Sequence, residues 1–182
     1  KAISNIQLTA NTLKVARPNF PADLSYLKDY SALHFPKGKM LVIVNYDLYS
    51  SISAAVNQYV CDLAYEGYFA EVYRYRNGNP VHLRDFIKAR MPVKGVLFIG
   101  NLPVAWFEMS NDFYGASSEF PCDLYYMDTD GTWLDPDGDG KFSAHPTNVK
   151  PEIWVGRLWT PDQNGNNATL INDYFSRNHK FR

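Results

Sequence analysis

The sequence predicts an α/β fold, a three-layer sandwich built on a short parallel sheet. Short runs of apolar residues, typical of strands that are buried on both faces, alternate along the chain with amphipathic helical patterns. The spacing of these runs suits strand–helix–strand units, whose right-handed crossovers place helices on both faces of the sheet. We expect residues 1–38 to form an N-terminal extension that packs on this domain, which spans residues 39–182.

A buried strand and an amphipathic helix open the domain. Met40–Tyr46 is a continuous apolar run and predicts the strand. An apolar stripe over Ile52–Ala64 predicts the helix, with Ser50 or Ser51 as its N-cap and Gly67 as its C-terminal stop.

A second strand, a second helix and a third strand follow. The β-branched and aromatic residues of Tyr68–Tyr75 predict the strand. Asn79 as the N-cap and Pro80 in the first turn open the helix, and Pro92 ends it. The inner stripe of this helix consists of Leu83, Phe86, Ile87 and Arg90. The apolar run Gly95–Gly100 predicts the third strand.

A fourth strand and a last helix complete the predicted fold. Glu152–Gly156 predicts the strand, and Asn167 caps the helix that follows it. The apolar face of this helix consists of Leu170, Ile171, Tyr174 and Phe175. In the N-terminal extension, Asp23–Leu33 predicts a short helix. The long connection between the third and fourth strands is expected at the carboxyl ends of the strands, where open α/β sheets bind ligands.

This long connection is strongly acidic. It carries six aspartates, with no lysine or arginine between the first and the last: Asp123, Asp128, Asp130, Asp135, Asp137 and Asp139. Carboxylates this close repel one another unless a cation lies between them. Hard oxygen ligands that are spaced by two residues and turned by glycine are typical of calcium loops. The sequence therefore predicts bound Ca²⁺, and the alternative is a solvated acidic turn, since Asp and Gly also dominate turns.

The candidate ligands follow the EF-hand order in part. Positions one, three, five, six and seven of such a loop are taken by Asp135, Asp137, Asp139, Gly140 and the carbonyl of Lys141. The match ends at position twelve, which is Pro146 instead of a bidentate glutamate, and no helical pattern flanks the loop. We therefore predict a helix-free calcium loop, whose oxygen shell is completed by Asp128, Asp130 and the more distant Glu152.

Other chemistries find little support. The net charge of −1 gives no sign of nucleic-acid binding, and the chain has neither a P-loop nor a G-x-G-x-x-G motif for nucleotides. No apolar run reaches the about 20 residues of a membrane span. His145 lies near the acidic loop, but no second His or Cys stands at the spacing of a zinc site. Arg157, directly after the fourth strand, suits a structural ion pair or a carboxylate-binding site.

The cysteines leave alternatives open. Cys61 and Cys122 suit either one disulfide bond of a secreted protein or two buried thiols. Cys122 follows Pro121 and precedes a strand-like segment, which is the better place for a nucleophile. A Cys-His enzyme also needs an imidazole at a neighbouring strand end, and no histidine follows a predicted buried strand. We therefore assign no catalytic residue in this chain.

Four segments of the chain share an order and a spacing that point to a family. They are Val96–Ala105, Phe120–Gly131, Glu152–Leu158 and Ile171–Asn178. The first contains a strand that leads into a G-x-L-P turn, and the third has the form Glu-apolar-apolar-Val-Gly-Arg. Together, from about residue 38 onward, they resemble the gingipain-type, caspase-like cysteine peptidases of secreted bacterial proteins.

The resemblance concerns only one part of that family's catalytic region. The region consists of two abutting caspase-like α/β subdomains, and this chain is similar to the first. The resemblance implies a caspase-like or flavodoxin-like topology, structural calcium with Glu152 among its ligands, and a secreted or cell-surface bacterial protein. The second subdomain of the same polypeptide would be its partner and would carry the catalytic His and Cys. This chain alone is then expected to be inactive, and to belong to a cysteine endopeptidase if the polypeptide continues.

A rival interpretation is a free-standing, calcium-dependent binding module without catalysis. Its ligand would be a glycan or a peptide. The surface for it would be an aromatic cluster that consists of Trp106, Phe107, Phe113, Tyr114 and Phe120. The same cluster also suits plain packing over the strand ends. The two interpretations differ in whether the chain works with a catalytic subdomain.

Overall fold

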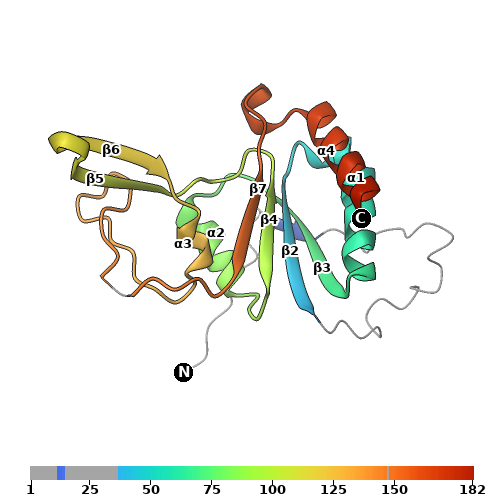
Figure 1. Ribbon diagram of the computed structural model, residues 1–182, viewed down its shortest axis with the longest axis horizontal. Coiled ribbons are helices and arrows are strands. Elements are labelled where there is room, and N and C mark those ends of the chain that lie inside the picture. The colour runs from blue at the N-terminus through green and yellow to red at the C-terminus, as the bar shows by residue number, and fades with distance from the viewer. Residues whose placement is uncertain (1–11, 15–36, 147) are drawn as a thin grey trace. The chain divides into compact units, whose positions relative to one another are not determined.

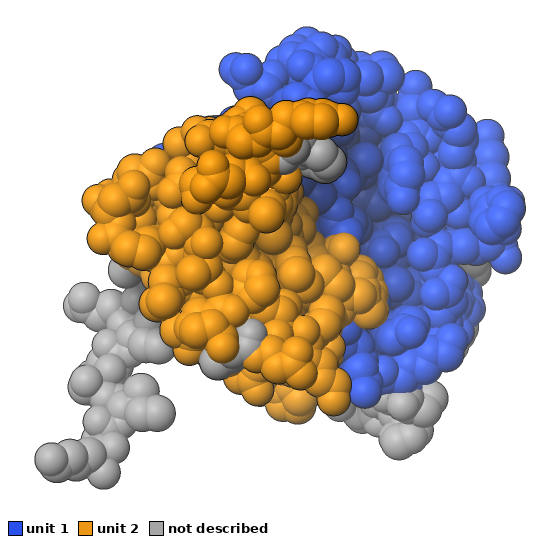
Figure 2. Space-filling model, turned by 60° about the vertical axis from the view of Figure 1, so that its left-hand side comes forward, with its two compact units in different colours: residues 1–77, 93–102, 156–182 blue, residues 78–92, 103–155 orange. Residues whose placement is uncertain are grey.

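The computed structural model describes residues 12–14, 37–146 and 148–182 (Figure 1). The predicted helix Asp23–Leu33 and most of the N-terminal extension lie outside the described residues. The fold is α/β, with a mainly parallel sheet and helices packed against it, as the sequence predicts. The chain divides into two compact units (Figure 2): residues 1–77, 93–102 and 156–182 make unit 1, and residues 78–92 and 103–155 make unit 2.

The sheet has five strands in the order β1-β3-β2-β4-β7. Their bounds are Thr12–Lys14 for β1, Gly38–Asn45 for β2, Tyr68–Tyr75 for β3, Gly95–Ile99 for β4 and Trp154–Leu158 for β7. The central strand β2 pairs in parallel with β3, from Gly38 opposite Tyr68, and with β4, from Met40 opposite Gly95. Strand β1 pairs with β3 in the antiparallel direction. The side chains of residues 40–44 are all buried, which explains the unbroken apolar run there.

Helices α1 (Tyr49–Tyr65) and α4 (Ala168–Phe181) lie side by side and pack on one face of this sheet (Figure 1). Alternate residues of β2 and β3 meet them in a shared core. Its buried members include Val42, Val44, Val72, Ile52, Val56, Val60, Ile171 and Phe175. The predicted apolar face of α4 is confirmed at Ile171 and Phe175, whereas Leu170 and Tyr174 are exposed.

The two predicted asparagine caps are confirmed, and the predicted serine cap is wrong. Asn79 Oδ1 accepts the His82 backbone N–H at the start of α2 (Pro80–Lys88), and Asn167 Oδ1 accepts that of Leu170 at the start of α4. The N-cap of α1 is Leu48 and not Ser50 or Ser51. Asn45, at the end of β2, causes this shift, because its side chain accepts the backbone N–H groups of residues 47 and 48 and turns the chain early.

Unit 2 contains an antiparallel hairpin that the sequence did not predict. It consists of β5 (Trp106–Asp112), a short 3-10 turn (Phe113–Gly115) and β6 (Ala116–Pro121). Phe107 stands opposite Phe120, and Glu108 stands opposite Glu119. Since side chains alternate along a strand, the hairpin has an aromatic face and an acidic face.

Helix α3 (Leu124–Met127) replaces the strand-like segment expected after Cys122. The Asp123 carbonyl accepts the N–H groups of Tyr126 and Met127, and this closes a single helical turn with Tyr126 fully buried. The predicted strand Glu152–Gly156 begins two residues later, at Trp154. The backbone N–H groups of Glu152 and Ile153 both donate to the Met127 carbonyl and are therefore held outside the sheet. Another 3-10 turn (Gln163–Gly165) precedes α4.

Candidate metal centre

The acidic connection brings its carboxylates together in two separate groups, both in unit 2. The Asp128 group consists of Asp128, Asp130 and Glu152, and the Glu108 group consists of Glu108, Asp137 and Asp139. Within each group, one oxygen of every residue lies within 4.8 Å of the others. The sequence-based interpretation placed the aspartates and Glu152 in one ligand set. The structure distributes them over two sets and adds Glu108, which the sequence did not indicate.

Asp128 is the buried centre of the first group, with 1% of its surface exposed. Its Oδ1 accepts the Gly131 N–H at 3.2 Å, and its Oδ2 accepts the Trp133 indole N–H at 2.8 Å. A Cβ on residue 131 would come within 1.9 Å of Asp128 Oδ2, so only glycine fits there. The carboxylate thus folds its own turn and fixes the orientation of Trp133.

Glu152 reaches this turn from a segment 23 residues farther along the chain. Its Oε2 accepts the Thr129 backbone N–H at 2.6 Å and lies 3.2 Å from Thr129 Oγ1. The Glu152 backbone N–H donates to the Met127 carbonyl at 3.0 Å. Side chain and backbone therefore both fasten the end of the acidic connection to its beginning.

A buried cation from another element supports the same turn. Arg84, on α2, is 8% exposed, and its guanidinium donates to the carbonyls of Asp128 and Gly131. The guanidinium also lies 4.7 Å from the centre of the Tyr125 ring. Arg84 therefore brings a positive charge to the backbone of this turn, which the sequence argument about the aspartates did not include. The one signal in the sequence is that Arg84 lies between Leu83 and Ile87, within the arc of the apolar stripe of α2.

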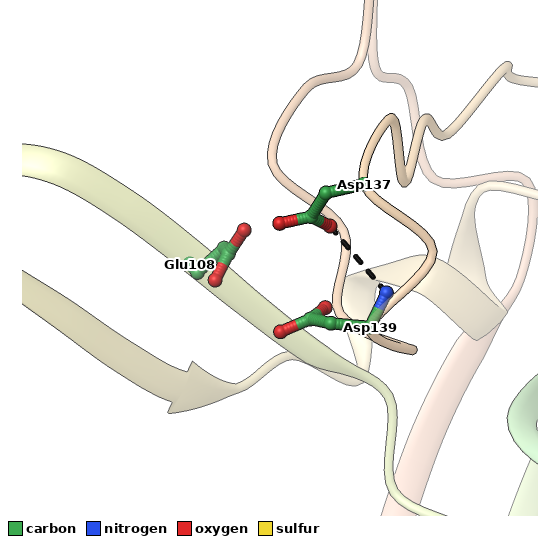
Figure 3. A group of neighbouring side chains, drawn as sticks. All are labelled: Glu108, Asp137 and Asp139. Carbon is green, nitrogen blue, oxygen red and sulfur yellow. Dashed lines mark hydrogen bonds between the residues drawn. The ribbon is translucent and has the colours of Figure 1, made fainter.

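The Glu108 group joins β5 to the loop that follows residue 135. Figure 3 shows the Glu108 side chain on β5 facing the carboxylates of Asp137 and Asp139 on that loop. Asp137 Oδ1 accepts the Asp139 backbone N–H at 3.4 Å. The spacing of residues in the sequence does not indicate Glu108 as a ligand, because Glu108 lies on a hairpin whose strand pairing is visible only in the structure.

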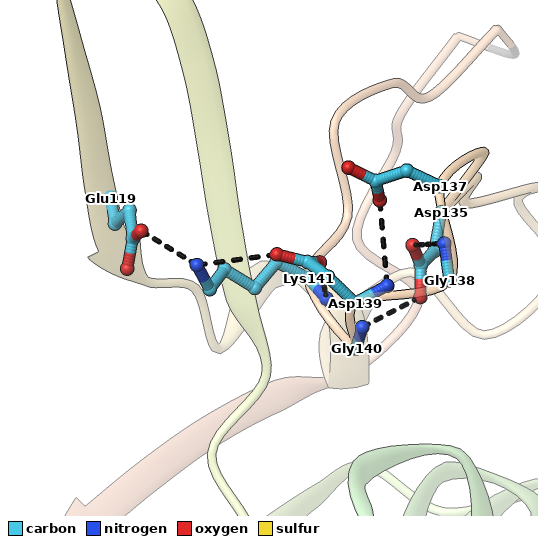
Figure 4. Close-up of polar contacts among 7 residues, drawn as sticks. All are labelled: Glu119, Asp135, Asp137, Gly138, Asp139, Gly140 and Lys141. Atoms are coloured by element: carbon cyan, nitrogen blue, oxygen red, sulfur yellow. Dashed lines mark hydrogen bonds and ion pairs between the residues drawn. The ribbon is translucent and has the colours of Figure 1, made fainter.

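The Glu108 group has opposed electrostatic effects on its members. Desolvation, and then the charges of Asp139 and Asp137, raise the pKa of Glu108. The Lys141 backbone N–H, which donates to Asp139 Oδ1 at 2.9 Å, lowers the pKa of Asp139. Lys141 Nζ also contacts Asp139 Oδ2 at 3.3 Å and Glu119 Oε1 at 2.6 Å (Figure 4). The group is therefore crowded with negative charge at Glu108 and partly neutralised at Asp139.

Asp135 belongs to neither group. Its two oxygens accept the backbone N–H groups of Gly138 at 2.8 Å and of Gly140 at 2.9 Å (Figure 4). Gly138 and Gly140 both have positive φ, of 74° and 92°, which favours glycine in this loop. In the structure Asp135 shapes the loop that carries Asp137 and Asp139, whereas the sequence placed it first among the ligands.

Both groups consist of carboxylates alone, which suits a hard cation and not zinc. The other candidates from the sequence have different surroundings. Cys61 and Cys122 form no disulfide bond, so the disulfide alternative is wrong for this structure. Burial raises the pKa of the half-buried Cys122. The Arg157 guanidinium lies 4.8 Å from the centre of the Phe98 ring and donates to the Leu102 carbonyl.

Comparison of the chain with protein-family models, with curated proteins and with solved structures found no match in any of the three. The described helices are all too short or too polar to cross a lipid bilayer.

Removing the buried guanidinium should loosen the whole Asp128 turn. We expect Arg84→Met to lower the free energy of unfolding by roughly 2–3 kcal/mol, because a buried and a half-buried carbonyl lose a charged donor. Lys88→Met, an exposed change on the same helix, should cost less than about 0.5 kcal/mol. Denaturant unfolding curves measure both. Equal losses in the two variants would contradict the role of Arg84.

The raised pKa of Glu108 makes the stability of the fold depend on pH in a defined direction. A carboxyl group whose pKa is higher in the folded chain stabilises the fold at low pH, and this contribution is lost as the pH rises through the folded pKa. Without calcium, Glu108→Gln should therefore match the parent near pH 4 and melt higher than it at pH 7. Glu119→Gln, on the opposite strand, loses its contact with Lys141 and should not melt higher. Thermal melts in chelator across this pH range test the pair, and a Glu108→Gln variant that melts lower at pH 7 would contradict the prediction.

Proposed function

We propose that this chain is the calcium-binding N-terminal subdomain of a secreted gingipain-like cysteine peptidase. In this proposal the α/β fold is a three-layer sandwich of caspase-like or flavodoxin-like topology, and calcium orders the long connection between β4 and β7. The chain supports a catalytic subdomain of the same polypeptide. The α/β fold with its mainly parallel sheet agrees with the proposal, and the four family-like segments suggest the peptidase.

The observation that carries the proposal is the position of the two carboxylate groups. Each joins residues that are distant in the sequence: Glu152 meets Asp128 and Asp130, and Glu108 meets Asp137 and Asp139. Ordering the connection costs about 1–2 kcal/mol of backbone entropy per residue. A cation that binds only the folded arrangement offsets part of that cost by linkage. This geometry supports the proposal of a structural role for calcium.

The ligand type favours calcium over softer ions, since hard oxygen ligands suit it. The oxygens of each group lie within 4.8 Å of one another, close enough to share one cation. Magnesium demands a tighter octahedron and keeps most of its waters. We therefore propose one calcium ion in each group, with water and backbone carbonyls as the remaining ligands.

No chemical step is assigned to this chain. A nucleophilic thiol is activated by a lowered pKa, and the pKa of Cys122 is raised by burial. The proposed contribution to peptidase activity is therefore mechanical: a folded support whose long connection is held by metal.

Calcium should raise the melting temperature, and each group should account for part of the effect. At a calcium concentration 100 times Kd, we expect about 2.7 kcal/mol of added stability for each occupied site. Asp137→Asn and Glu152→Gln should each remove part of this gain and one bound ion. Asp173→Asn, an exposed change on α4, is the matched control and should leave the gain unchanged. Differential scanning calorimetry in calcium and in EGTA, together with metal analysis after dialysis, gives both quantities. A melting temperature that EGTA leaves unmoved would contradict the calcium proposal.

The reading frame of the gene beyond Arg182 tests the peptidase part of the proposal. We expect the reading frame beyond Arg182 to encode two further buried strands, the first ending in His-Gly and the second in Cys. A stop codon or a polar linker at that point would contradict the peptidase and would favour the calcium-dependent binding module.

A further inference from the structure

The aromatic face of the β5–β6 hairpin borders a hollow in unit 2. Its volume is about 450 Å³, within the usual range of ligand sites. The lining residues that matter here are Phe107, Met109, Phe120, Cys122, Trp133 and His145. Two members of the aromatic cluster singled out in the sequence, Phe107 and Phe120, therefore belong to the hollow. Tyr114 is fully exposed at the tip of the hairpin.

The walls of the hollow are held in place before any ligand arrives. The Trp133 ring meets Phe107 edge-on, with 6.0 Å between ring centres, and lies 5.4 Å from the His145 ring. The indole N–H of Trp133 is taken by Asp128 Oδ2, so the indole orientation is fixed by a buried carboxylate. Phe107 is 9% exposed, whereas Met109 and Phe120 are 43% and 38% exposed and form the accessible rim. A rigid wall and an open rim reduce the entropy cost of binding.

The uncharged lining of the hollow restricts which groups can bind in it. None of the ten lining residues is Lys, Arg, Asp or Glu. A charged group placed there would lose its hydration without gaining a partner. The polar side chains available are Ser110, Ser143, Cys122 and His145. Most of the lining is apolar or aromatic, which fits an apolar or aromatic side chain.

The outer edge of β6 has backbone groups that can hydrogen-bond with the backbone of an extended peptide. Among the strands in the described part of the chain, β6 pairs only with β5. The outer edge of β6 therefore presents backbone N–H and C=O groups to which an extended peptide can add. Phe120, on β6, lines the hollow, so a peptide along this edge would have the hollow within reach of its alternate side chains.

We propose that unit 2 binds an extended peptide segment through this site, with the peptide backbone on the edge of β6 and one uncharged apolar or aromatic side chain in the hollow. The site lies on the opposite face of β5 from Glu108, and it needs no catalytic subdomain. It goes beyond the calcium proposal and does not require it, because the lining residues contribute no ligand to either carboxylate group.

Cys122 offers a direct probe, because it lines the hollow while Cys61 is fully buried. We would measure the rate of Cys122 alkylation by iodoacetamide on the full chain, in calcium and in EGTA. The ligand is an acetylated, amidated pentapeptide of threonines with phenylalanine at its centre. At a peptide concentration ten times Kd, alkylation should slow about tenfold, since only about a tenth of the molecules then have an empty hollow. The same peptide with N-methylated amides should protect far less, because it cannot pair with β6.

Variants and a competing ligand separate the possible outcomes. Met109→Glu places a charge on the rim and should abolish protection, whereas Ser117→Glu, on the other face of β6, should leave it intact. Protection in either buffer supports the inference, so a failed calcium proposal would leave it standing. No protection in both buffers overturns it. Equal protection by methyl glucoside, by the N-methylated peptide, or in Met109→Glu also overturns it.

Discussion

The buried turn at Asp128 is the interaction on which unit 2 depends. One carboxylate accepts the Gly131 N–H and the Trp133 indole N–H, and the carbonyl of the same residue accepts the Arg84 guanidinium. The next residue, Thr129, is held by Glu152 from the far end of the connection. Three segments that are far apart in the sequence therefore meet at four consecutive residues, next to the packed rings of Tyr125, Trp133 and Phe142.

Such a turn is sensitive to how its charge is balanced. A buried carboxylate is tolerated when hydrogen bonds and an opposite charge replace its hydration. The Asp128 carboxylate has two N–H donors, and the Arg84 guanidinium donates to the carbonyls of the same turn. In the Glu108 group, Lys141 contacts Asp139, but the pKa of Glu108 is still raised, by desolvation and then by the charges of Asp139 and Asp137. The Glu108 group is thus the part of unit 2 for which a bound cation would change the electrostatic balance most.

The sequence predicts the sheet well because burial on both faces leaves an unmistakable apolar run. Strands β2, β3 and β4 and helices α2 and α4 lie close to their predicted bounds. The β5–β6 hairpin was missed, because its two faces differ in character and neither strand is buried enough to show a run. Arg84 and Glu108 were missed for a related reason: each acts through a contact with a loop at least 29 residues away, and no local pattern encodes such a contact. The aspartates were found from local spacing, but their division into two groups depends on the same long-range contacts.

Terbium luminescence tests the central claim, calcium binding by the two carboxylate groups, most directly. Terbium takes the oxygen ligands that calcium takes, and it emits when a nearby tryptophan absorbs. Trp133 is hydrogen-bonded to Asp128 and would sensitise an ion in the Asp128 group. The account predicts strong emission that calcium displaces and that Glu152→Gln and Trp133→Phe each weaken, while an ion in the Glu108 group is still sensitised by Trp106 on β5. Emission that is absent, or that none of these changes affects, would contradict it.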